Sequence, residues 1–101
     1  MPKAFRPNKK GKQPTKSLHT PAYERIRTLL REIRHAANLS QEELATRLGR
    51  EQIYVSRCES GLRRVDLLEW LEIILACEAD PGAFIGTVLP MVKLPRDEAD
   101  R

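Results

Sequence analysis

The fold of this 101-residue chain is decided by one stretch, LSQEELATRLGREQIYVSRCESG, at positions 39–61. Ser40 followed three residues later by Glu43 is typical of a capping box, in which a hydroxyl and a carboxylate each satisfy a backbone amide at a helix start. The pattern predicts a helix over about 41–48, with its apolar side chains on one face. Gly49 is expected to end this helix, because glycine tolerates the left-handed backbone of a helix terminus.

A second helix is predicted directly afterwards, over about 51–59, with Val55 and Cys58 facing inward and Ser60-Gly61 at its end. The connection between the two helices is too short for an antiparallel hairpin. We therefore expect the helices to meet at the sharp corner of a helix-turn-helix.

Helical periodicity also surrounds this corner. Apolar residues recur at three-to-four spacing after Thr20-Pro21. Asp66 and Glu69 form a second, acidic capping pair, and Asp80-Pro81 marks a further helix start. No strand-like alternation is present. The fold class expected is all-α, a compact five-helix domain with helices over about 21–37, 41–48, 51–59, 66–79 and 80–89. Asn38 is expected to end the first helix in the left-handed conformation.

The charge of the chain is unevenly distributed. Residues 1–20 carry six basic and no acidic side chains, residues 47–64 carry five basic against two acidic, and residues 65–90 carry five acidic and no basic ones. We expect a polyanion to meet the first two regions. The predicted organisation is a disordered basic arm (1–20), a helix-turn-helix domain (21–90), whose DNA-binding role is implied by a family resemblance described below, and a flexible C-terminal tail (91–101). The arm either contacts DNA or acts as a solubility tail.

Several classes of function are not expected. Charged residues interrupt the apolar runs well short of the roughly 20 residues that span a bilayer, so we expect a cytoplasmic protein without membrane contact. Cys58 and Cys77 lie in apolar helical patterns, and neither stands at ligand spacing from a histidine, so buried thiols and no metal are expected. No nucleophile with a base, and no glycine-rich phosphate loop, is present, so neither an enzyme nor a cofactor is expected.

Three segments, 39–45, 48–49 and 55–61, together resemble the Cro- and lambda-repressor-like (XRE-type) helix-turn-helix family. The resemblance covers about residues 23–89. It implies a lambda-repressor-like fold and double-stranded DNA as the partner, with the N-terminal half of helix 51–59 in the major groove. The residues expected at the DNA are Gln41, Arg50, Glu51, Gln52, Ile53, Ser56, Arg57, Arg63 and Arg64.

Side chains on helix 51–59 have the chemistry for base contacts. Gln52 can form two hydrogen bonds with adenine, Arg57 can bind guanine or a phosphate, and Ile53 can touch a thymine methyl group. By resemblance, Gln52, Ile53 and Ser56 match the positions that usually contact bases. Glu51 can accept a hydrogen bond from cytosine, or it can exclude wrong sites by repelling phosphates.

Polar residues around this helix suit the DNA backbone. Arg50, Arg63 and Arg64 flank it and are expected to bind phosphates. Gln41 stands at the start of helix 41–48, where amides and the helix dipole favour an anion. In the family this glutamine contacts the DNA backbone.

Two expectations concern packing. By resemblance, Arg34 and Glu59 form an ion pair that fixes the third helix against the first.

The fourth helix is apolar on more than one face: its core residues are predicted to be Leu67, Leu68, Leu71, Ile74 and Leu75. A second stripe, Trp70, Ile73 and Cys77, either packs on the fifth helix or forms a dimer surface.

These features favour a sequence-specific transcription regulator, a repressor that binds a short inverted repeat as a homodimer through its fourth and fifth helices. Two alternatives stay open. An antitoxin or phage-type regulator would also have a protein target. A non-specific nucleic-acid or protein-interaction adaptor would bind mainly through the basic arm, with a steep salt dependence.

Overall fold

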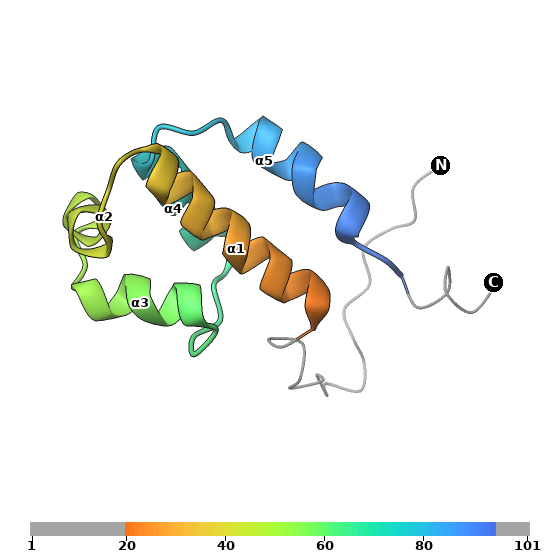
Figure 1. The fold of residues 1–101 in the computed structure, drawn as a ribbon, viewed down its shortest axis with the longest axis horizontal. Helices are drawn as coiled ribbons and strands as arrows, with labels where there is room; N and C mark the ends of the chain where they lie inside the picture. Colours follow the sequence, from red (N-terminus) through yellow and green to blue (C-terminus); the bar gives the residue numbers. More distant parts are fainter. Residues whose placement is uncertain (1–19, 95–101) are drawn as a thin grey trace.

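Five α-helices and one short 3-10 helix follow one another along residues 20–94, the part of the chain that the computed structural model describes (Figure 1). Their bounds are α1 Pro21–Ala36, α2 Gln41–Leu48, α3 Gln52–Ser60, α4 Leu67–Ala76, α5 Pro81–Val88 and η2 Leu89–Met91. The five-helix, all-α prediction is confirmed for this range. Residues 1–19 of the predicted arm and 95–101 of the predicted tail lie outside the described residues.

The predicted corner joins α2 to α3 (Figure 1). Gly49 has a φ of 69°, in the left-handed region, and directs the chain out of α2. The amide of Arg50 donates to the Ala45 carbonyl at 2.9 Å, which closes the last turn of α2. The backbone is therefore fixed where α2 ends and the corner begins.

Reciprocal side-chain caps set the starts of α2 and α4. The Ser40 hydroxyl accepts from the Glu43 amide at 3.0 Å, and the Glu43 carboxylate accepts from the Ser40 amide at 2.8 Å. Asp66 and Glu69 form the same pair at 2.8 and 3.1 Å. Hydrogen bonds from Ser40 hold the pKa of Glu43 below its ordinary value. Both capping pairs expected from the sequence are confirmed.

Two helix limits differ from the prediction. α4 ends at Ala76 rather than near Ala79, because Glu78 turns into the left-handed region at φ 57°. Glu51 is the extended N-cap residue of α3 rather than its first helical residue, and its side chain makes no capping hydrogen bond. Asn38, at φ 60°, ends the first helix as expected.

The core lies where the first four helices meet. Leu30, Leu44, Val55 and Ile73 are each at most 1% exposed and pack around the equally buried Cys58. Each such side chain stabilises the fold by about 1.5–3 kcal/mol through its removal from water. Burial also raises the pKa of the Cys58 thiol, so this cysteine behaves as a small apolar side chain.

The predicted faces of α4 were correct only in part. Ile74, assigned to the core, is fully buried, and Trp70 of the second stripe packs on the fifth helix, with its ring centroid 5.8 Å from that of Phe84. Ile73 and Cys77, assigned to a second stripe, are buried in the core. Three leucines assigned to the core are instead 60–67% exposed: Leu67, Leu68 and Leu75. The helix is apolar on both sides, so its sequence did not indicate which face meets α2 and α5.

Among residues 20–94, no helix is both long and apolar enough to cross a membrane.

Two glycines offer a matched test of the corner. A Cβ atom would meet nothing within 4 Å at either Gly49 or Gly86, but only Gly49 has a positive φ. We predict that Gly49→Ala lowers the free energy of unfolding by about 1–2 kcal/mol, because the left-handed conformation is strained for alanine. Gly86→Ala, within α5, is predicted to raise it by about 0.5–1 kcal/mol. Urea unfolding measures both values, and equal effects of the two substitutions would contradict the prediction.

Candidate nucleic-acid interface

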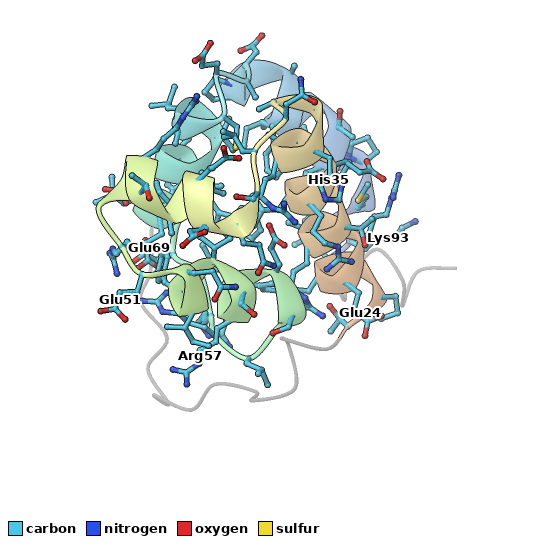
Figure 2. All side chains as sticks on the ribbon, turned by 60° about the vertical axis from the view of Figure 1, so that its left-hand side comes forward. Glu24, His35, Glu51, Arg57, Glu69 and Lys93 are labelled. Atoms are coloured by element: carbon cyan, nitrogen blue, oxygen red, sulfur yellow. The ribbon has the colours of Figure 1, made fainter. Side chains whose placement is uncertain are left out.

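The first two turns of α3 present the side chains expected to contact bases. Gln52, Ile53 and Arg57 are exposed, and Ser56 is half-buried between them. Figure 2 shows Glu51 and Arg57 pointing away from the body of the protein on this side. Val55 and Cys58 on the opposite face of the helix are buried. One face of α3 is thus fixed in the core and the other is available to a ligand.

A buried ion pair holds α3 against α1. The Arg34 guanidinium donates through Nε to Glu59 Oε2 at 2.6 Å and through Nη2 to Oε1 at 3.0 Å. The side chains are only 8% and 2% exposed. Arg34 Nη1 also donates to the Leu39 carbonyl at 2.9 Å, and Arg31 donates to the Glu59 carbonyl at 3.0 Å. The ion pair expected from the resemblance is confirmed.

Two glutamines extend this ion pair to the protein surface. Gln41 Nε2 donates to Glu59 Oε1 at 2.9 Å, and Gln41 Oε1 accepts from Gln52 Nε2 at 2.6 Å. A glutamine amide can donate only through nitrogen and accept only through oxygen. The buried Glu59 carboxylate therefore sets the orientation of Gln41, and Gln41 sets that of Gln52.

A second polar cluster lies at the junction of α3, the following loop and α4. Arg63 donates to the two Glu69 oxygens at 2.8 and 2.9 Å. The guanidinium carbons of Arg50 and Arg63 lie 4.3 and 4.9 Å from the centroid of the Tyr54 ring. Hydrogen bonds from Arg63 hold the pKa of Glu69 below its ordinary value, and burial raises the pKa of Tyr54 to about 12.

Comparisons with known proteins agree with this geometry. A family model described as a helix-turn-helix domain matches residues 25–83. A solved structure of an XRE-family like protein from Pseudomonas syringae pv. tomato str. DC3000 has 38% sequence identity and a TM-score of 0.69, covering 78% of this chain and 96% of that chain. The chain belongs to the XRE-type helix-turn-helix family. A search of curated proteins gave no match.

Membership of this DNA-binding family agrees with the expectation that the chain is not an enzyme. The candidate interface residues, from Gln41 to Arg64, all lie within the range 25–83 that the family model matches. Among residues 20–94, no three His, Cys, Asp or Glu side chains lie close enough to hold a metal ion.

The arginines predicted to bind phosphates have different environments. Arg50, Arg57 and Arg64 are exposed, whereas the guanidinium of Arg63 is engaged by Glu69. Arg47 is directed away from α3, because its Nη1 donates to the Ala76 carbonyl at the end of α4 at 2.7 Å. The sequence alone did not indicate which arginines are exposed and which are engaged within the protein.

Two residues of the polar cluster, Tyr54 and Glu69, were not among the sequence-predicted site residues. Glu69 was recognised only as the capping partner of Asp66, and that pairing is present. Its bond to Arg63 depends on the path of the loop between α3 and α4, for which the sequence has no signal. Tyr54 is buried on α3, and its position in the sequence gives no signal for its contacts with Arg50 and Arg63.

The buried ion pair can be tested against an exposed one. We predict that Glu59→Ala lowers the free energy of unfolding by about 3–5 kcal/mol, because Arg34 is left buried without its anion. Glu32→Ala removes the exposed Arg25–Glu32 pair, whose atoms are 3.9 Å apart, and should change the value by less than about 1 kcal/mol. Urea unfolding compares the two variants. A Glu59→Ala effect as small as that of Glu32→Ala would contradict the assignment.

Proposed function

We propose that this protein is a sequence-specific regulator of transcription that represses by binding a short inverted repeat in double-stranded DNA as a homodimer. Its family supplies the DNA-binding domain. Repression, the dimer and the individual base contacts are parts of the proposal. A repressor of this kind acts on the chromosome, so a cytoplasmic location belongs to the proposal as well.

The observation that carries the proposal is the fixed amide of Gln52. One of its N–H groups is used by Gln41, at 2.6 Å, and its oxygen and second N–H remain for a ligand. Adenine presents an acceptor and a donor side by side in the major groove, which matches this pair. An adenine contact by Gln52 therefore requires no rearrangement of the hydrogen bonds around Glu59.

Neighbouring residues extend this contact along the groove. Ile53 is 48% exposed beside Gln52 and can pack against a thymine methyl group. Arg57 lies about one turn further along α3 and can bind guanine or a phosphate. Ser56 is small enough to let the helix approach the bases. Glu51 stands at the start of α3, where its carboxylate can accept from cytosine or repel a phosphate.

Backbone contacts complete the proposed interface. Gln41, at the start of α2, and the arginines at 50, 63 and 64 lie on the segments that border α3. Phosphate contacts fix the position of a protein on the duplex, whereas base contacts select the sequence. We assign orientation to this outer set and specificity to α3.

A second copy of the chain is proposed to cover the exposed apolar residues of α4 and α5. Large apolar side chains on α4, on α5 and at the start of η2 are 46–67% exposed: Leu67, Leu68, Leu75, Ile85 and Leu89. A monomer rarely leaves so many apolar side chains on neighbouring helices in water. Pairing through this surface would provide two copies of α3, and two such helices about 34 Å apart contact successive major grooves on one face of the DNA.

Selection of bound DNA from a random-duplex pool at near-physiological salt tests the function. We predict an enriched inverted repeat that contains adenine in each half-site, both for the full chain and, with lower affinity, for a version lacking residues 1–20. Gln52→Ala should reduce discrimination at that adenine by about 1–3 kcal/mol and leave the other positions unchanged.

Other outcomes identify the alternatives. An enriched single half-site would contradict the dimer but keep sequence-specific binding. No enriched sequence, together with binding that is lost when residues 1–20 are removed, would contradict the regulator and favour the electrostatic adaptor.

A further inference from the structure

Two of the arginines expected at the DNA backbone share one anion and one aromatic ring. Arg50 precedes α3 and Arg63 follows it, yet both lie against Tyr54 and both approach Glu69 Oε2, at 3.8 and 2.9 Å. The cluster joins the two ends of α3 to the start of α4. Figure 2 shows Glu69 on the same side of the protein as Glu51, at the start of α3.

Arg63 uses much of its hydrogen-bonding capacity inside the protein. Its Nη1 donates to Glu69 and to the Arg64 carbonyl, at 2.8 and 2.9 Å, and its Nη2 donates to the second Glu69 oxygen at 2.9 Å. A bidentate guanidinium–carboxylate pair of this kind is among the strongest side-chain contacts. Arg63 is thus part of the support of the loop.

Arg50, unlike Arg63, keeps its guanidinium N–H groups available. Its guanidinium makes no hydrogen bond within residues 20–94; it is held by the Tyr54 ring at 4.3 Å and by the charge of Glu69 at 3.8 Å. The side chain is 43% exposed, and its backbone is anchored by the 2.9 Å bond from its amide to the Ala45 carbonyl. A guanidinium has five N–H donors, so Arg50 is oriented while its donors stay available.

We propose that Tyr54 and Glu69 are positioning residues that hold Arg50 ready to bind a DNA backbone phosphate beside the start of α3. Arg63 supports the same platform by fixing Glu69. This assignment rests on the proposed DNA-binding function and goes beyond it, because it separates Arg50, held ready for a phosphate, from Arg63, which supports it, and gives two residues outside the predicted site a part in DNA binding.

The physical basis is preorganisation. A free arginine loses rotamer entropy when it binds a phosphate, and an arginine already held against a ring loses less. A planar guanidinium can stack on the ring and still donate along its edge in a fixed fork, whereas a lysine ammonium is a compact charge on a flexible stem that neither stacks nor forms such a fork. Two guanidinium groups share one carboxylate, so the cluster keeps a net positive charge that attracts a phosphate.

A double-mutant cycle on DNA affinity tests the proposal. The full chain and its variants are titrated into a labelled duplex of fixed mixed sequence at several salt concentrations, since phosphate contacts do not depend on base sequence. We expect Arg50→Ala to weaken binding about ten-fold and to make the salt dependence shallower by about one unit of slope. Arg50→Lys should keep the slope and weaken binding about three-fold or more.

The role of the Tyr54 ring is tested in the wild-type chain and in the Arg50→Ala variant. Tyr54→Leu should weaken binding about three-fold in the wild-type chain and have no effect in Arg50→Ala. Tyr54→Phe keeps the ring and should weaken binding less than Tyr54→Leu does. Glu69→Gln should likewise weaken binding only when Arg50 is present. Circular dichroism checks that each variant is folded, and if Tyr54→Leu does not fold, the Arg50→Lys and Glu69→Gln results decide.

Equal losses from Tyr54→Leu or Glu69→Gln in the two backgrounds would overturn the proposal, as would an Arg50→Ala slope identical to that of the wild type. Tighter binding by Glu69→Gln would also overturn it, because Glu69 would then compete with the phosphate rather than position Arg50. Failure of the wild-type chain to bind the duplex at all would instead contradict the proposed function.

Discussion

The structure depends on the buried ion pair between Arg34 and Glu59. Two opposite charges in a site with 8% and 2% side-chain exposure must satisfy each other, because the loss of hydration of each ion is large. Two hydrogen bonds between the guanidinium and the carboxylate, at 2.6 and 3.0 Å, hold α3 against α1. The remaining lone pair of Glu59 Oε1 is taken by Gln41, so the same constraint continues to the surface. A buried electrostatic requirement thereby determines the orientation of the exposed Gln52 amide.

The polar cluster of Arg50, Tyr54, Arg63 and Glu69 acts at the other side of α3. The ion pair of Arg34 fixes the helix from within the core, and this cluster fixes the segments that precede and follow it. Both arrangements hold an exposed side chain, Gln52 or Arg50, against a partner that is itself fixed by other contacts. Such preorganisation lowers the entropy lost on binding, and it explains how a helix of nine residues can serve as a defined contact surface.

Most of the fold could be predicted from local sequence signals. The Ser40–Glu43 box, Gly49 and Asn38 act through their own backbone neighbours, so their effects are visible in the sequence. The faces of α4 could not be predicted, because leucine and isoleucine occur on both sides and only tertiary packing selects between them. The same is true of Glu69, whose capping role is local but whose bond to Arg63 depends on the loop. Which candidate site residues touch DNA stays a prediction.

The coupling between the buried ion pair and Gln52 can be tested by replacing the pair with apolar residues of similar size, Arg34→Met together with Glu59→Leu. DNA selection then measures the base preference of the folded variant. Such a replacement can leave a fold stable, so stability and specificity can be separated. If Glu59 orients Gln52 through Gln41, the variant binds DNA with a weakened preference for adenine at the Gln52 position and unchanged preferences elsewhere. An adenine preference equal to that of the wild-type chain would contradict the account.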